Sequence, residues 1–478
     1  MRKFTLINII ILLYVSIMAT RMIAEKSVDF ILTGVSREQA SEDIRLCSIF
    51  VAERITDVYY KPWMFSEVAS TFAKSGQRDL AAAILEKALM VASTIEDESY
   101  KSDALLEISE GYAEINNFDK ALKVAGRIRT PLSRTKGFNN IARKYIENKE
   151  TQKAEQILFV ALIGAGVMKG KAADTANKEI ALTYAKMGKF QEALSVAMEI
   201  KDSEGRVEAL TVLASAGTET GEKEKTMSVL ERAVETAELV GDNAYAASSY
   251  ALISMSYAKA GEKEAALKLA ARAGEKLENV TSKHERQNVL LKMAEAYAEL
   301  GKSDESFIYA KRIEDETKAP VAFAKAAGSY FKAGNEAKAR EALEEALAVS
   351  GKIRSGYSQA KVMNNIVSVY LEMGDMKKAL EAARAMKDDY TQPRALSTVA
   401  LKMWQAGQKG EAPGIMAEAL EVIRTIKDNF YKSWALADIA VKYNEAGIEL
   451  DEKTRKTLEG IVEDVGKEEE RSAVPQSL

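Results

Sequence analysis

Reactive side chains are scarce in this sequence. Among 478 residues there is one cysteine, Cys47, and one histidine, His284. A single cysteine cannot form an internal disulfide, and a single histidine excludes the usual multi-histidine metal sites. We expect Cys47 to be a small core residue of an early helix, with a dimer-forming thiol as the alternative, and His284 to be solvated. No metal or cofactor site is predicted.

Proline and long basic segments are also rare. The chain has six prolines, is 47% hydrophobic and is dominated by Ala, Glu, Lys and Leu. Runs of alternating β-branched residues are hard to find, so the folded part is predicted to be all helical. Lys and Arg total 67 against 71 Asp and Glu, a net charge of −4. Nucleic-acid binders usually carry a basic stripe, so no nucleic-acid partner is expected.

Residues 1–24 have the layout of an export segment. Arg2 and Lys3 precede an apolar run from Phe4 to Ala19. That run has 16 residues, or about 24 Å of helix. It is shorter than the ~20 residues that span a bilayer comfortably. We interpret it as a signal peptide, with an uncleaved membrane anchor as the alternative. Either interpretation predicts an exported protein, periplasmic or extracellular, that touches a membrane only through this segment.

A short pattern recurs along the rest of the chain. The stretch from Tyr184, YAKMGKFQEALSVA, returns from Tyr257 as YAKAGEKEAALKLA and from Tyr297 as YAELGKSDESFIYA. Alignment on this pattern gives eleven predicted turns, at Gly76, Asn116, Lys149, Gly188, Gly221, Gly261, Gly301, Gly334, Gly374, Gly407 and Gly447. An aromatic residue stands four places before most turns: Phe72, Tyr112, Tyr145, Tyr184, Tyr257, Tyr297, Tyr330, Tyr370 and Tyr443. A small residue stands five places after most: Ala81, Ala121, Ala154, Ala193, Ala266, Ser306, Ala339, Ala379 and Ala412.

This spacing predicts helical hairpins. Positions 4, 7, 8 and 11 before each turn lie within about 100° of one another on a helix, so they form one buried stripe. Glycine accepts the left-handed backbone that ends the first helix. The small residue lets the second helix approach the first closely. One hairpin cannot bury its stripe alone, so successive hairpins must stack.

The tyrosine, the turn glycine and the alanine five places later resemble the tetratricopeptide repeat. The chain is similar to a degenerate, bacterial-type array of about eleven such units, from roughly Pro62 to Gly466. Two features depart from the family: the closing proline is mostly absent, and alanine stands at positions such as Ala197 and Ala270 where an aromatic is usual. A related helical-hairpin solenoid therefore stays possible. The resemblance implies a right-handed α-solenoid whose first helices line a concave groove that binds protein partners.

The distance between turns almost alternates between two lengths, with one place, at Gly221 and Gly261, where a long step follows a long step. Successive turns are 40, 33, 39, 33, 40, 40, 33, 40, 33 and 40 residues apart. The two lengths differ by about two helical turns, so we expect long and short second helices with the same buried face. Long units share a joint, seen as YYKPW at Tyr59, SYKSD at Ser99 and FYKSW at Phe430.

The predicted organisation has five parts. Residues 1–24 are the export segment, and residues 25–61 are a linker followed by a capping helix from about Arg37 to Tyr59. The repeat array occupies residues 62–450. A second capping helix follows at residues 451–466, and residues 467–478 are a charged tail predicted to be disordered.

Three segments with some likeness to catalytic motifs are better explained structurally. Gly164–Ala172 has the wrong spacing for a phosphate loop and joins two helices. Asp388–Asp389 and Glu314–Asp315 stand at short joints, where Asp commonly caps the next helix. Sugar-cleaving helical toroids use two carboxylates, but their sites are rich in Trp and His, and this chain has three Trp and one His. We predict no enzymatic activity, and such an enzyme is the third hypothesis.

The groove face offers one candidate binding site. Positions six before each turn are mixed and neutral in charge through most of the array, but the last two repeats project Leu401, Trp404, Trp434 and Val441 onto it. Clustered aromatics in a concavity are typical of binding hot spots. The alternative is that the closing helix or the tail covers these residues. The sequence thus predicts an exported protein-interaction scaffold, with a membrane-anchored envelope assembly factor or chaperone as the alternative.

Overall fold

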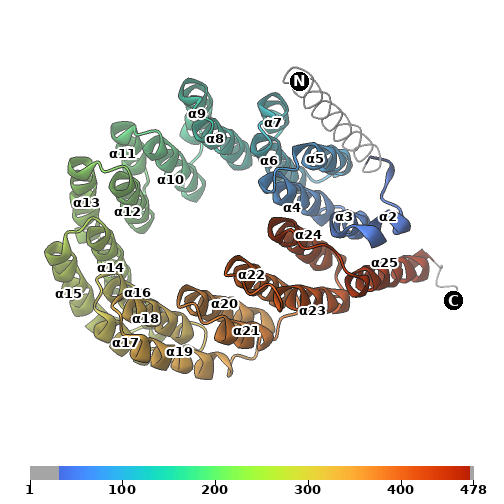
Figure 1. Ribbon diagram of the computed structural model, residues 1–478. Helices are drawn as coiled ribbons and strands as arrows, with labels where there is room; N and C mark the ends of the chain where they lie inside the picture. Colours follow the sequence, from blue (N-terminus) through green and yellow to red (C-terminus); the bar gives the residue numbers. More distant parts are fainter. Residues whose placement is uncertain (1–31, 474–478) are drawn as a thin grey trace, which may run out of the picture. The chain divides into compact units, whose positions relative to one another are not determined.

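A computed structural model of the protein describes residues 32–473, and side chains up to Glu469. The predicted export segment and the first residues of the linker lie outside this range. Within it the chain forms α-helices joined by turns and no β-strand, as the composition predicted (Figure 1). No helix among these residues is long and apolar enough to cross a membrane.

The helices alternate between two classes. The first helices of the hairpins are α4 (Tyr60–Lys74), α6 (Glu98–Glu114), α8 (Pro131–Glu147), α10 (Lys171–Lys186), α12 (Ser203–Glu219), α14 (Asn243–Lys259), α16 (Lys283–Glu299), α18 (Ala319–Lys332), α20 (Gly356–Glu372), α22 (Gln392–Gln405) and α24 (Asn429–Ala446). The second helices are α5 (Arg78–Ser93), α7 (Phe118–Ala125), α9 (Thr151–Gly166), α11 (Phe190–Met198), α13 (Lys223–Glu238), α15 (Lys263–Glu278), α17 (Ser303–Lys311), α19 (Glu336–Ser350), α21 (Met376–Arg384) and α23 (Ala412–Thr425). Three further helices belong to the chain ends: α2 (Arg37–Glu42), α3 (Ile44–Glu53) and α25 (Glu452–Ala473).

All eleven predicted turns are confirmed. Each turn residue has a positive φ, from 61° at Gly447 to 86° at Gly407, and Asn116 and Lys149 adopt the same conformation with φ 63°. In most turns the residue after the turn residue donates its N–H to the carbonyl of the residue that stands four places before the turn. At the Gly188 turn, for example, the Lys189 N–H donates to the Tyr184 carbonyl at 3.0 Å. This is the hydrogen bond of a Schellman motif, and it closes the first helix.

The predicted large-over-small packing is also confirmed. All nine small residues after the turns are fully buried. Eight of the nine aromatics before the turns are buried; the ninth, Tyr297, stacks on Tyr309 with ring centroids 5.3 Å apart. Eight of the eleven turns therefore combine an aromatic residue before the turn with a small residue after it, which is the packing the repeat encodes.

Second-helix length follows the spacing of the turns. Where two turns are 39 or 40 residues apart, the second helix between them has 14 to 16 residues, and where they are 33 apart it has 8 or 9. The extra length is close to two helical turns, so the buried face keeps its direction.

The helices belong to two compact units. Of the described residues, unit 1 contains 32–133 and 404–473, and unit 2 contains 134–403. In unit 2, consecutive first helices from α10 to α20 contact one another, so the hairpins stack as a solenoid. Stacking of α4 on α6 in unit 1 follows the same rule.

Unit 1 also contains a hairpin made from both ends of the chain. Helix α24 packs along α3 as a first helix packs along its second helix, and it contacts α4 as one first helix contacts the next (Figure 1). The Ser433 hydroxyl donates to the Ser48 carbonyl at 2.8 Å, and both residues are buried. We call this pair, α3 with α24, the split hairpin. Helix α24, the first helix of the last repeat, thus pairs with α3, which lies near the start of the chain and occupies the place of a second helix.

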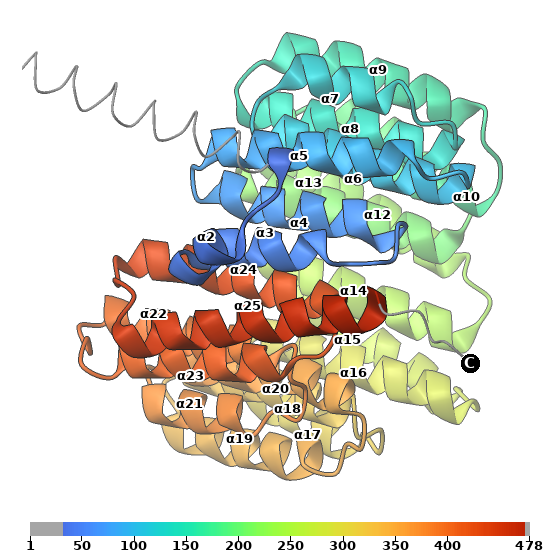
Figure 2. The same ribbon diagram turned by 90° about the vertical axis from the view of Figure 1, so that its right-hand side faces the viewer.

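The two end segments differ in detail from the prediction. The expected helix from Arg37 to Tyr59 is two helices, because the Asp43 carboxylate accepts the Arg45 N–H and starts α3 anew. The tail expected from Lys467 is helical to Ala473. Its helix is held by the ion pairs Arg54–Glu469 (3.0 Å) and Arg424–Asp464 (2.9 Å). Figure 2 shows α25 running along α23 and α2, which it contacts together with α3.

Candidate functional site: an aromatic cleft in unit 1

Three adjacent first helices of unit 1 begin in the same way. In α24, α4 and α6 an aspartate accepts the backbone N–H two residues later: Asp428 from Phe430 (2.8 Å), Asp57 from Tyr59 (2.8 Å) and Asp97 from Ser99 (2.9 Å). These carboxylates satisfy N–H groups that a helix start otherwise leaves unpaired. The joint motif noted in the sequence is therefore a shared helix start, and the contacts of α4 with α24 and α6 place its three copies in a row.

Two of the three joint lysines hold the end of the preceding helix. Lys61 Nζ donates to the Glu53 carbonyl at the end of α3 (2.5 Å), and Lys101 Nζ donates to the Ile95 carbonyl after α5 (3.0 Å). A cation at these carbonyls complements the helix dipole. Lys432, the third of the set, is only 2% exposed, and burial lowers its pKa.

Aromatic side chains of these joints meet at the surface. Trp63 and Tyr60 contact Phe430 with ring centroids 5.0 and 6.2 Å apart, Phe430 contacts Tyr431 at 5.2 Å, and Tyr59 contacts Tyr100 at 4.6 Å. Tyr60 and Tyr100 are each 53% exposed, and Trp63 is 38% exposed. We call this set the aromatic strip: Tyr59, Tyr60, Trp63, Tyr100, Phe430 and Tyr431. Exposed apolar patches of this kind mark interaction sites more often than stray surface residues do.

A cleft of about 880 Å³ opens beside the strip. Its lining joins Tyr60, Trp63, Phe430 and Tyr431 to five carboxylates, Glu53, Asp57, Asp428, Glu468 and Glu469, and to two cations, Arg54 and Lys61. The walls come from the ends of α3 and α25 and the starts of α4 and α24. The cleft therefore exists only because the two ends of the chain pack together.

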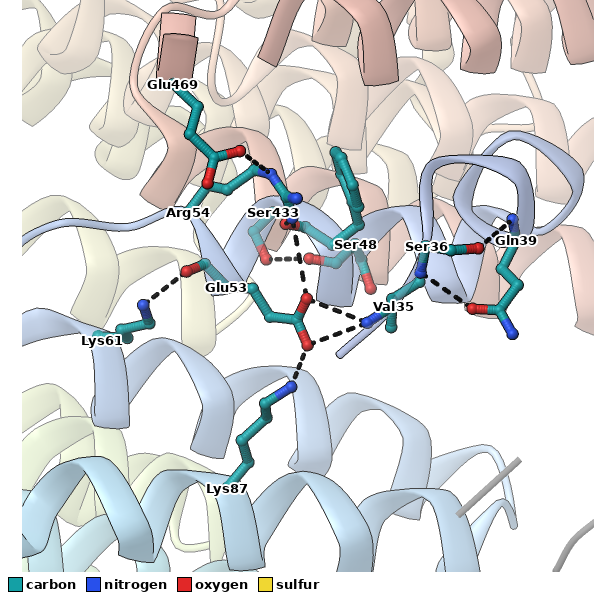
Figure 3. A network of polar contacts seen from close by, with 11 residues as sticks. Val35, Ser36, Gln39, Ser48, Glu53, Arg54, Lys61, Lys87, Ser433 and Glu469 are labelled. Carbon is teal, nitrogen blue, oxygen red and sulfur yellow. Dashed lines mark hydrogen bonds and ion pairs between the residues drawn. The ribbon is translucent and has the colours of Figure 1, made fainter. Parts of the chain in front are cut away.

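Several residues of the cleft lining belong to a polar network (Figure 3). The Glu53 carboxylate accepts the Val35 N–H at 3.2 Å and pairs with Lys87 of α5. Arg54 pairs with Glu469 at 3.0 Å, and its guanidinium lies 3.4 Å from the centre of the Phe50 ring. These contacts fix the positions of Glu53, Arg54 and Glu469, so the charged part of the lining is preorganised.

The residues singled out in the sequence lie elsewhere. Leu401 is 8% exposed in α22 and belongs to unit 2, whereas Trp404, Trp434 and Val441 are half-buried residues of unit 1. Trp404 carries Lys409 over its ring at 5.1 Å. Their role in partner binding stays a prediction. Helix α24, which carries Trp434 and Val441, packs on α3 and α4.

Unit 2 has a groove where the repeat pattern predicts one. A depression of about 340 Å³ is lined by first helices α14, α16, α18 and α20. Met255, Glu295 and Gly328 line it, and each stands six residues before its turn, the position predicted to face the groove. Its charges are mixed, with Lys259, Lys325, Lys332, Glu295, Glu299 and Glu372. The predicted neutral groove is thus present in this part of the array.

The other residues for which the sequence analysis expected a structural role lie in structural positions. Cys47 is a fully buried free thiol, and burial raises its pKa to about 12. His284 is exposed at the start of α16, and Gly164–Ala172 spans the connection between α9 and α10. Asp388 and Asp315 accept backbone N–H groups at their joints, from Thr391 (2.8 Å) and Thr317 (2.9 Å). Among residues 32–473 no cluster of acidic, histidine or cysteine side chains could hold a metal ion.

Comparison with known proteins gives structural likeness only. No family model and no curated protein matches the chain. Solved structures that it resembles include Ton1535 from Thermococcus onnurineus, with 18% identity, a TM-score of 0.29, and coverage of 70% of this chain and 98% of that one. A signal-transduction ATPase from Pyrococcus horikoshii with a tetratricopeptide repeat sensor shares 17% identity over 79% of this chain and 66% of its own, with a TM-score of 0.30.

A third structure, aspartyl phosphate phosphatase F from Bacillus subtilis, shares 13% identity over 79% of this chain and 95% of its own, with a TM-score of 0.29. What the structure itself shows is an array of helical hairpins, with a left-handed residue at all eleven turns and, in most hairpins, an aromatic residue before the turn and a small residue after it.

Proposed function

We propose that this protein is a helical-repeat scaffold that binds a segment of a partner protein at the aromatic strip and cleft of unit 1. The observation that supports this most directly is the exposure of Tyr60, Trp63 and Tyr100 beside a cleft of about 880 Å³. Aromatic anchors at the edge of a preorganised cleft are the side chains that most often dominate protein–protein affinity.

The test is site-specific photo-cross-linking in extract of the source cells. A benzoylphenylalanine at Tyr60 is expected to capture a protein partner. The matched control is Tyr245, which is 47% exposed and also follows a capping aspartate, Asp242, by three residues at the start of α14. Adding Trp63→Ala or Phe430→Ala to the Tyr60 probe should abolish capture, because each lost anchor costs about 2 kcal/mol, or roughly 30-fold in affinity.

Two results would contradict the proposal: equal capture from both probe positions, or capture that persists in the Trp63→Ala and Phe430→Ala chains. Circular dichroism melting of each variant checks that the fold is kept. Trp63 and Phe430 are partly exposed, so their replacement should leave the melting temperature nearly unchanged.

We further propose that the protein is exported. Support comes from the sequence of residues 1–24, in which two cations precede the apolar run from Phe4 to Ala19. A signal peptide predicts a mature chain that begins near Thr20 or Glu25. Intact-mass measurement on protein from its natural host tests this: a full-length mass in the membrane fraction would favour an anchored assembly factor, and a full-length mass in the cytosol would contradict export.

A further inference from the structure

We propose that the cleft of unit 1 receives a lysine or arginine side chain from an extended segment of the partner protein. This inference rests on the proposed function and names the chemistry of its ligand. It follows from two independent properties of the same cleft: an excess of carboxylates in its lining and aromatic rings at its edge.

The first property is charge. The lining contains five carboxylates and two cations. Glu53 and Glu469 are paired with Lys87 and Arg54. Asp57 and Asp428 are exposed, and each holds its helix start with Oδ1, so their negative charge faces the solvent of the cleft. Glu468 adds to the same potential. A cation that enters the cleft meets a surface of opposite sign, which favours both encounter and orientation.

The second property is the arrangement of rings. Trp63 and Phe430 are tilted by 33° with centroids 5.0 Å apart, and Tyr60 meets Phe430 edge-on at 72°. All three rings line the cleft, and a guanidinium or ammonium that lies over a ring face within about 6 Å of the ring centre is attracted by it. The aliphatic stem of lysine or arginine covers apolar surface as the charged end enters.

The two cations in the cleft lining are engaged by groups at the end of α3 and by Glu469. Arg54 is held by Glu469, the Phe50 carbonyl and the Phe50 ring, and Lys61 Nζ donates to the Glu53 carbonyl. Both are directed to the end of α3. The groove of unit 2, by contrast, has three lysines and three glutamates in its lining and no aromatic side chain, so it has no comparable preference for a cation.

The experiment uses the full-length protein and three labelled peptides. Each is a 12-residue Gly–Ser peptide with three evenly spaced guest residues: lysine, glutamine or glutamate. Fluorescence anisotropy at about 50 mM salt is expected to show binding in the order lysine, then glutamine, then glutamate. Affinity for the lysine peptide should fall as salt rises, because the contact is electrostatic.

The deciding variant is Asp57→Asn with Asp428→Asn. Asparagine keeps the cap hydrogen bonds and removes both charges, so the fold is retained while affinity for the lysine peptide falls about tenfold. Asp242→Asn, the same change at the start of α14, is the matched control and should leave binding unchanged. Trp63→Ala should weaken the lysine peptide, and Trp63→Phe should restore most of that loss, because a π face is kept.

Three outcomes would overturn the inference: equal binding of all three peptides, no binding of any, or lysine-peptide binding that ignores the Asp57/Asp428 change. Binding to phosphatidylcholine vesicles that is lost in Trp63→Ala but kept in the double asparagine variant would identify a lipid surface instead, and would also overturn it. None of these results alters the cross-linking test, so a partner captured at Tyr60 without a charge preference would preserve the proposed function alone.

Discussion

The first turns of α4 in unit 1 and α14 in unit 2 are built alike, yet they produce different surfaces. Each has an aspartate that accepts backbone N–H groups and an exposed tyrosine three residues later, Tyr60 or Tyr245. Beside α4 lie α24 and α6, which repeat the aromatic joint, and the rings touch. The joint that starts α14, DNAYAAS, contributes a single ring. A binding surface thus arises from which repeats become neighbours, and one repeat alone does not make it.

The largest expected difference between the two units is how far along the chain a destabilising change is felt, and it involves the split hairpin. Phe50→Ala removes a fully buried ring from α3 and should cost about 3 to 5 kcal/mol. Because α3 packs on α24, hydrogen-exchange protection should fall in Asn429–Ala446 as well as in Ile44–Glu53. Cys47, buried beside Phe50 and unique in the chain, should react faster with a thiol reagent. Unchanged protection in α24 would refute the split hairpin.

The matching change in unit 2 should act only locally. Tyr257→Ala removes a buried aromatic before the Gly261 turn and should cost about 3 kcal/mol. Its neighbours in the stack are close in sequence, so protection should fall around α14 and α15 and persist in α3 and α24. Cys47 labelling should stay slow. A uniform loss of protection over both units would mean that they unfold as one.

Lowering the pH should reduce the stability that Asp315 contributes to unit 2. Burial alone would raise the pKa of Asp315, but hydrogen bonds from Lys318 and Thr317 outweigh it and lower the pKa to about 2. A carboxylate whose pKa is lower in the folded state than in the unfolded state stabilises the fold at every pH above the unfolded pKa, near 4. This contribution is lost as the pH falls from about 4 to about 2. With allowance for solvent screening, the contribution is about 1 kcal/mol. Urea titrations at pH 7 and pH 3 should show Asp315→Asn less stable than the parent at pH 7, with the difference reduced to about half at pH 3.

The smallest effects concern the two turns that lack glycine. Lys149 in unit 2 holds φ at 63° with an exposed side chain, so Lys149→Gly should relieve backbone strain and stabilise by about 0.5 to 1 kcal/mol. Asn116 in unit 1 has the same φ, but asparagine tolerates it better, so Asn116→Gly should gain less. Thermal melts decide both. A loss of stability in Lys149→Gly would show that the turn does not strain lysine.

Local features could be predicted from the sequence because each is encoded within one repeat. The turn at Lys149 is predicted by alignment on Tyr145 before it and Ala154 after it, and its φ agrees with that of the glycines. The alternation of long and short second helices followed from the spacing in the same way. The split hairpin could not be predicted, since α3 carries no turn motif and its partner lies 385 residues away at the Ser433–Ser48 contact.

One signal for it was present. Seven of the ten residues of α3 are buried, among them Ile44, Cys47 and Phe50. The stretch IRLCSIFVAE is apolar on more than one face, which favours a helix packed between partners over a cap with one exposed side. The joints YYKPW and FYKSW were recognised as related in sequence. Their meeting in one cleft depends on α24 lying beside α4, and no local pattern specifies that contact.

The split hairpin also sets an order of events during synthesis. Helix α3 leaves the ribosome early, but the segment that covers Ser48 and Phe50 is made only when residues 429–446 emerge. At typical rates of about 5 to 20 residues per second, α3 waits for tens of seconds with its apolar face uncovered. Closing a loop of this length is entropically costly, so the last hairpin should assemble after the repeats of unit 2. The nascent chain therefore passes through a stage in which unit 2 is already folded while α3 still exposes apolar side chains that can associate with other chains.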